Sequence, residues 1–95
     1  MKDGELSRLR DEIERIDRAL VQLIAERVRI ARAVGVVKRL EGMPTLDPAR
    51  EAVIIRRATG LAREAGLPEE DVREIFWHLV GLSRRAQLET PAGGD

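Results

Sequence analysis

The fold is decided by residues 6–40, which read LSRLRDEIERIDRALVQLIAERVRIARAVGVVKRL. Apolar residues recur along this stretch at alternating steps of three and four, which places them on one face of an α-helix. No proline interrupts the pattern before Pro44, so we expect one helix from Asp3 to about Leu40, roughly 55 Å long. Its apolar seam consists of Leu6, Leu9, Ile13, Ile16, Leu20, Leu23, Ile30, Val34 and Val37.

The length of this helix predicts a homodimer. A compact chain of 95 residues has a radius of gyration of about 12 Å and a diameter of roughly 30 Å. A helix of roughly 55 Å extends well beyond such a globule, and its distal seam would face water unless a second chain covers it. We therefore expect an intertwined dimer in which the long helices pair.

Two shorter helices are expected after a loop at 41–46. Asp47 as N-cap and Pro48 at the first helical position predict the start of the second helix, and Gly66 its end. Pro68 and the acidic residues after it open a third helix that runs to about residue 88. The expected inner faces are Ala52, Ile55, Ala58 and Ala62, then Val72, Ile75, Phe76, Leu79 and Val80. The chain is thus predicted to be a single all-α domain over residues 4–89, with a disordered tail at 90–95.

Composition excludes several classes of function. Seventeen basic and 17 acidic residues cancel, so no nucleic-acid or membrane-surface partner is expected. The chain has no cysteine and one histidine, which argues against disulfides, thiolate chemistry and a metal centre. No apolar run approaches the roughly 20 residues of a membrane span, and the charged N-terminal sequence lacks a signal-peptide core. We expect a soluble, cytoplasmic domain.

Two cations interrupt the first helix. Arg27 occupies a seam position between Leu23 and Ile30, where an unpaired guanidinium costs several kcal/mol. Lys38 lies on the same side, roughly 16 Å further along the axis, so the two side chains could hold a small dianion between them. An internal salt bridge or register control would equally explain Arg27, and interaction with the helix dipole would explain Lys38.

Polar residues also continue the apolar stripe of the third helix. Ser83 and Gln87 present a hydroxyl and an amide there, which indicates a polar pocket between helices, unless the stripe simply reaches solvent. The second helix opens with Asp47, Arg50 and Glu51, for which capping and a surface ion pair are sufficient explanations. Arg10 lies outside the seam, about 25 Å from Arg27. It could share a site with Arg27 only across an antiparallel dimer and is otherwise a surface residue.

Taken together, these segments resemble the AroQ-class chorismate mutases, in the monofunctional form found in bacteria. The resemblance covers about residues 6–88 and keeps the family's spacing between helices. It is carried by Leu9-Arg10, Ile16-Asp17, Leu23 to Arg27, Val34 to Lys38, Asp47-Pro48-Ala49-Arg50-Glu51, and Ile75-Phe76 through Ser83 and Gln87.

The resemblance implies three-helix chains that intertwine as a dimer with two equivalent sites. It also implies an isomerase that rearranges chorismate to prephenate, in the shikimate pathway to phenylalanine and tyrosine, with no cofactor, metal or covalent intermediate. Catalysis then consists of holding a flexible dianion in its reactive chair-like geometry and stabilising the charge that develops as the ether bond breaks.

The resemblance also assigns roles to individual residues. Arg27 and the partner subunit's Arg10 would bind the substrate carboxylates, with Ser83 as a further donor. Lys38 and Gln87 would donate to the ether oxygen, and Glu51 would accept from the ring hydroxyl. The catalytic residues would be Lys38, Gln87, Arg27 and Glu51, and the substrate-binding residues Arg10, Arg27, Lys38, Asp47, Arg50, Glu51, Ser83 and Gln87.

Two positions depart from the family pattern, and two other functions compete. Arg84 stands beside Ser83 where an apolar residue is expected near the pocket, and Thr45 stands where a branched apolar residue is more usual. Isochorismate-pyruvate lyases share the fold, the carboxylate-binding cations and the lysine-glutamine pair, but the opening from Asp47 to Glu51 resembles the mutases. A non-catalytic dimerisation module would explain the seam but not the polar residues within it.

Overall fold

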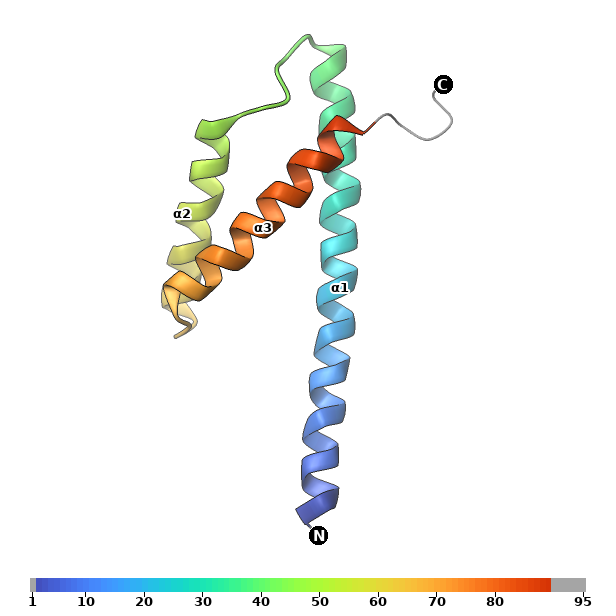
Figure 1. Cartoon of the computed structure of the whole chain (residues 1–95), viewed down its shortest axis with the longest axis vertical. Coiled ribbons are helices and arrows are strands. Elements are labelled where there is room, and N and C mark those ends of the chain that lie inside the picture. The colour runs from blue at the N-terminus through green and yellow to red at the C-terminus, as the bar shows by residue number, and fades with distance from the viewer. Residues whose placement is uncertain (1, 90–95) are drawn as a thin grey trace.

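Three helices follow one another along the chain in a computed structural model that describes residues 2–89, with side chains from residue 4 (Figure 1). They are α1 (Lys2–Leu40), α2 (Pro48–Glu64) and α3 (Glu69–Leu88). No strand occurs within this range, so the predicted all-α class and the three helices are confirmed. The tail at 90–95, predicted to be disordered, lies outside the described residues. None of the described helices has the length and apolarity needed to span a membrane.

The long helix α1 is continuous over 39 residues and extends far beyond the rest of the chain. In Figure 1 its N-terminal half stands alone, whereas α2 and α3 lie beside its C-terminal half. The described part measures 61 Å along its longest axis and has a radius of gyration of 17.5 Å, against about 12 Å for a compact chain of this length. The chain therefore leaves half of its longest helix without cover.

Local interactions fix the ends of α2 as the sequence predicts. The Asp47 carboxylate accepts a hydrogen bond from the backbone N–H of Arg50 at 3.1 Å, and Pro48 occupies the first turn. After the helix, Gly66 adopts a φ of 72°, which glycine reaches without strain and which turns the chain toward α3. This turn makes α2 and α3 neighbours.

Helix α3 joins the other two helices. It packs against both α1 and α2, whereas the backbones of α1 and α2 lie apart. The fully buried positions are mostly small, which lets the helix backbones approach closely; Ile55 and Val80 are the larger aliphatic residues among them. These buried positions are Ala31, Gly35, Ile55, Ala58, Thr59, Ala62, Val80 and Ala86.

The predicted apolar faces are buried only in part. Each of the nine seam residues of α1 is between 40% and 61% exposed, and Ile75 of α3 is 56% exposed. Ile75, Phe76 and Leu79 line an open apolar groove together with Leu20 and Leu23 of α1. A single chain therefore buries most of the predicted inner face of α2 but leaves the seam of α1 largely exposed.

Candidate active site

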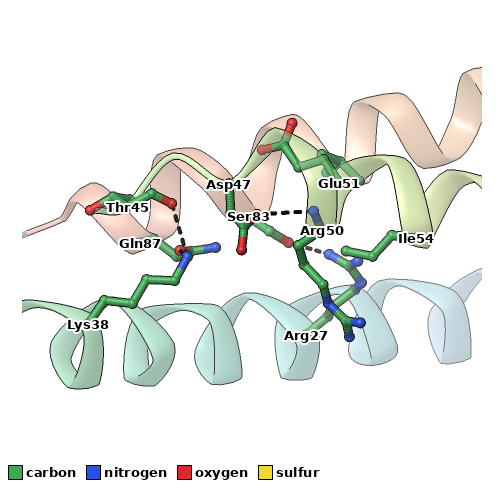
Figure 2. A pocket seen from close by; sticks show the side chains of 10 residues that line it. Arg27, Lys38, Thr45, Asp47, Arg50, Glu51, Ile54, Ser83 and Gln87 are labelled. Atoms are coloured by element: carbon green, nitrogen blue, oxygen red, sulfur yellow. Dashed lines mark hydrogen bonds between the residues drawn. The ribbon is translucent and has the colours of Figure 1, made fainter. Parts of the chain in front are cut away.

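All predicted site residues except Arg10 line one cavity between the three helices (Figure 2). It lies where the C-terminal half of α1, the start of α2 and the C-terminal half of α3 meet, and it measures about 320 Å³ including the part open to solvent. The lining residues are Arg27, Lys38, Thr45, Asp47, Arg50, Glu51, Ile54, Val80, Ser83 and Gln87.

Two uncharged hydrogen-bond acceptors on α3 hold the Arg27 guanidinium. The guanidinium donates to the Ser83 hydroxyl and, at 3.4 Å, to the Leu79 carbonyl oxygen. None of the ion pairs among residues 4–89 involves Arg27, so the internal salt bridge considered for it does not form in the described chain. Its positive charge therefore remains available to a ligand.

Lys38 and Gln87 form a pair of hydrogen-bond donors at the other end of the cavity. The Lys38 ammonium donates to the Thr45 carbonyl oxygen at 2.9 Å and to the Gln87 amide oxygen at 2.7 Å. Because an ammonium can only donate, the amide oxygen must face Lys38. The Gln87 amide nitrogen then points into the cavity, as Figure 2 shows. Both residues thus have N–H groups left for an acceptor in the cavity.

The position of Gln87 depends on two residues that sequence reasoning did not single out. Gly35 of α1 is buried against the Gln87 backbone, and a Cβ atom there would lie 2.8 Å from the Gln87 Cα. The Arg39 guanidinium donates to the carbonyl oxygens of Gln87 at 2.7 Å and Glu89 at 3.3 Å, which satisfies backbone acceptors at the end of α3. A glycine inside an otherwise strong helix pattern was the signal for this close approach.

The acidic residues of the cavity are each bound to a specific partner. Asp47 caps α2, as predicted. Glu51 accepts two hydrogen bonds from Arg84 of α3, from Nε at 2.9 Å and from Nη2 at 2.5 Å. These hydrogen bonds lower the pKa of the Glu51 carboxyl, against an opposing effect of burial, and they raise the pKa of Arg84. Arg84 therefore binds Glu51 and is absent from the cavity lining where an apolar residue was expected.

Three cations share the cavity without a carboxylate partner among residues 4–89. Arg50 extends from α2 toward α1 and Arg27 in Figure 2, and neither it nor Arg27 or Lys38 belongs to any ion pair in this range. Like charges gathered in a half-open cavity attract an anion. The described side chains contain no group of three or more acidic, histidine or cysteine residues arranged to hold a metal ion.

Arg10 is the one predicted site residue that this chain does not bring to the cavity. It lies on the exposed N-terminal half of α1, about 25 Å along the axis from Arg27. The chain alone thus gathers seven of the eight predicted positions, and the roles assigned to them stay predictions.

The fold and the cavity define an all-helical protein with a cavity between its helices in which three cations lack a carboxylate partner among residues 4–89. The chain belongs to the chorismate mutase type II family, whose family model matches residues 9–88. This confirms the family that the sequence pattern predicted.

Individual relatives agree with this assignment. The chorismate mutase of Methanocaldococcus jannaschii is 34% identical over 85 residues, which make up 90% of this chain and 86% of that protein. The T-protein of Enterobacter agglomerans is 35% identical over 73 residues, 77% of this chain but 20% of that protein, so the chain spans about a fifth of that relative's length. A solved structure, a conserved hypothetical protein from Pyrococcus furiosus, is similar with a TM-score of 0.70 and 33% identity over 86% of this chain and 93% of that one.

Proposed function

We propose that the protein is a cytoplasmic chorismate mutase, which rearranges chorismate to prephenate on the route to phenylalanine and tyrosine. The observation that carries this proposal is the cavity in which Arg27, Lys38 and Arg50 have no carboxylate partner within the described chain. Chorismate is a dianion, so its two carboxylates match this excess of positive charge. A chain without cysteine also suits the reducing cytoplasm.

The residues at the two ends of the cavity fit different parts of the reaction. The planar guanidinium of Arg27 suits bidentate binding of a carboxylate, and Ser83 beside it can donate to the same group. Lys38 and Gln87 offer N–H groups to the ether oxygen, where negative charge develops as the carbon–oxygen bond breaks. A preorganised donor of this kind is worth about 3–4 kcal/mol of transition-state stabilisation. Glu51, ionised and part-buried, can accept from the ring hydroxyl.

The proposal includes a homodimer that completes the site. The seam of α1 is exposed, and the buried core is made mostly of small residues. One chain therefore cannot cover its own apolar surface and needs a second chain to do so. If two α1 helices pair in opposite directions, the N-terminal half of one lies beside the C-terminal half of the other. The partner subunit's Arg10 would then reach the cavity and supply a second guanidinium for the substrate carboxylates.

The test is to incubate the purified protein with chorismate and to follow the loss of its absorbance. Nuclear magnetic resonance should identify the product as prephenate. A parallel incubation with isochorismate should release no pyruvate, which separates this activity from that of the isochorismate-pyruvate lyases. A rate no higher than that in buffer would refute the proposed function. Light scattering on the same sample should give the mass of two chains.

A further inference from the structure

Neither carboxylate that lines the cavity forms an ion pair with Arg27, Lys38 or Arg50. Asp47 is engaged with the Arg50 backbone N–H, at 3.1 Å. Glu51 is engaged with Arg84 through both of its oxygens. In Figure 2 the Glu51 carboxylate lies on the side of α2 away from α1, whereas the neighbouring Arg50 extends toward α1. The cavity thus contains acidic residues that are not paired with its cations.

This separation requires an explanation, because Glu51 could otherwise bind those cations itself. It lines the same cavity as Arg27, Lys38 and Arg50. The charged groups that act on it are Arg84 from α3, Asp47 at the start of α2 and Lys38 from α1, and Arg84 has the largest effect. A glutamate released from Arg84 at neutral pH would be a free anion beside three free cations. Such self-neutralisation would compete with any anionic ligand.

We propose that Arg84 is a positioning residue that keeps Glu51 from pairing with the cations of the cavity, so that these cations remain free for a dianionic ligand. The fork of two hydrogen bonds fixes both the distance and the plane of the carboxylate, which a single contact would not do. Each carboxylate oxygen keeps a lone pair, so Glu51 can still accept a hydrogen bond from a ligand hydroxyl. The identity of the dianion as chorismate rests on the proposed function, whereas the effect of Arg84 on anion binding does not.

A double-mutant cycle tests this role. The four proteins are the wild type, Arg84→Gln, Glu51→Gln and the double variant, titrated with malonate as a small dianion and followed by nuclear magnetic resonance. Arg84→Gln should weaken malonate binding about tenfold and raise the KM for chorismate by a similar factor. In the Glu51→Gln background the same substitution should change malonate binding less than about twofold, because a neutral amide at position 51 has no charge to place on the cations.

Two results would overturn the proposal. Equal weakening of malonate binding in both backgrounds would mean that Arg84 contacts the anion directly. Unchanged malonate binding in Arg84→Gln would mean that Glu51 stays away from the cations without it. Arg84→Lys keeps a charge beside Glu51 but loses the fork of two hydrogen bonds, so it should weaken malonate binding measurably, though less than Arg84→Gln, and it replaces Arg84→Gln in the cycle if circular dichroism finds that variant unfolded.

A matched control lies on the same helix. Arg73 forms an exposed ion pair with Glu70 at 3.1 Å, outside the cavity, and Arg73→Gln should leave malonate binding and KM unchanged. The two proposals fail in different ways. A wild type that binds malonate and obeys the cycle but does not convert chorismate would refute the proposed function alone.

Discussion

The two halves of α1 share one apolar seam but differ in what covers them. From residue 4 to residue 23 every side chain is exposed. In the C-terminal half, α3 packs on a second stripe made of Arg27, Ala31, Gly35 and Lys38, in which Ala31 and Gly35 are buried. The seam residues beside this stripe, such as Ile30 at 54%, remain exposed. The helix therefore uses one face to build its own cavity and leaves the other free for a second chain.

This difference suggests a division of labour in which one face of α1 lines the cavity and the other is the surface that we propose pairs with a second chain. Small residues at the centre of the second stripe admit the α3 backbone, and cations at its two ends reach into the cavity beside the contact. The N-terminal half contributes no residue to the cavity of its own chain. We propose that it contributes Arg10 to the cavity of the partner subunit. Four predictions test this difference between the two halves of α1.

The largest effect is expected at Lys38, the cation of the C-terminal half that we propose donates to the ether oxygen. Lys38→Ala should lower kcat about 100- to 1000-fold, because it removes a donor to the ether oxygen. The far-ultraviolet circular dichroism spectrum should stay unchanged. Arg29→Ala, at an exposed position of the same helix, should keep full activity. Near-normal turnover by the Lys38 variant would contradict the assigned role.

The next prediction concerns the Gln87 amide, a neutral donor that differs from a glutamate carboxyl by one heavy atom. Gln87 donates through its amide, so Gln87→Glu should be active only while the new carboxyl is protonated. Its kcat/KM should rise as the pH falls, whereas that of the wild type should not rise in this way. A variant with the pH profile of the wild type would show that position 87 does not donate to the substrate.

If each site combines residues of two chains, two inactive variants should complement each other in a mixed dimer. Arg10→Ala and Lys38→Ala should each be nearly inactive. When the two are mixed, unfolded and refolded together, half of the dimers should be mixed and carry one intact site each, which gives about a quarter of the wild-type sites. Refolding each variant alone is the control. No recovery in the mixture would mean that Arg10 acts within its own chain or not at all.

The smallest effect is expected at the contact between the second stripe and α3. Gly35→Ala places a Cβ 2.8 Å from the Gln87 Cα, so α3 must shift, at a cost of about 1–3 kcal/mol in the free energy of unfolding. The shift should also lower kcat by moving Gln87. Gly60→Ala is the matched control, because a Cβ there meets no atom within 4 Å and alanine favours a helix. A Gly35 variant as stable as the wild type would contradict the close contact.

The sequence predicted the helices well because their signals are local. The alternating apolar spacing predicted α1, and Asp47 with Pro48 predicted the start of α2. The seven residues that meet in the cavity were found as polar residues on apolar stripes and through the resemblance to a family. Each of these signals depends on residue type at a fixed spacing.

What the sequence did not predict depends on contacts between helices. Alanine and glycine give weak hydrophobic signals, so the second stripe of α1 was not predicted, and Arg27 was assigned to the one apolar seam. Arg84 was interpreted as a departure from the family pattern on the cavity wall. Its partner Glu51 is 33 positions away on another helix, so the sequence did not indicate the ion pair. The Arg39 contacts with the end of α3 likewise join residues 48 and 50 positions apart. Pairings at such separations follow only from the packed arrangement.

The uncovered seam of α1 has a consequence for how the protein responds to dilution. If a second chain covers this surface, the chain folds only as it assembles. The midpoint of thermal unfolding should then rise with protein concentration. Activity per chain should then fall on dilution together with helix content rather than before it. In that case the amount of chain that a cell makes would itself control the activity, since below the dissociation constant of such a dimer neither a stable fold nor a complete site would exist.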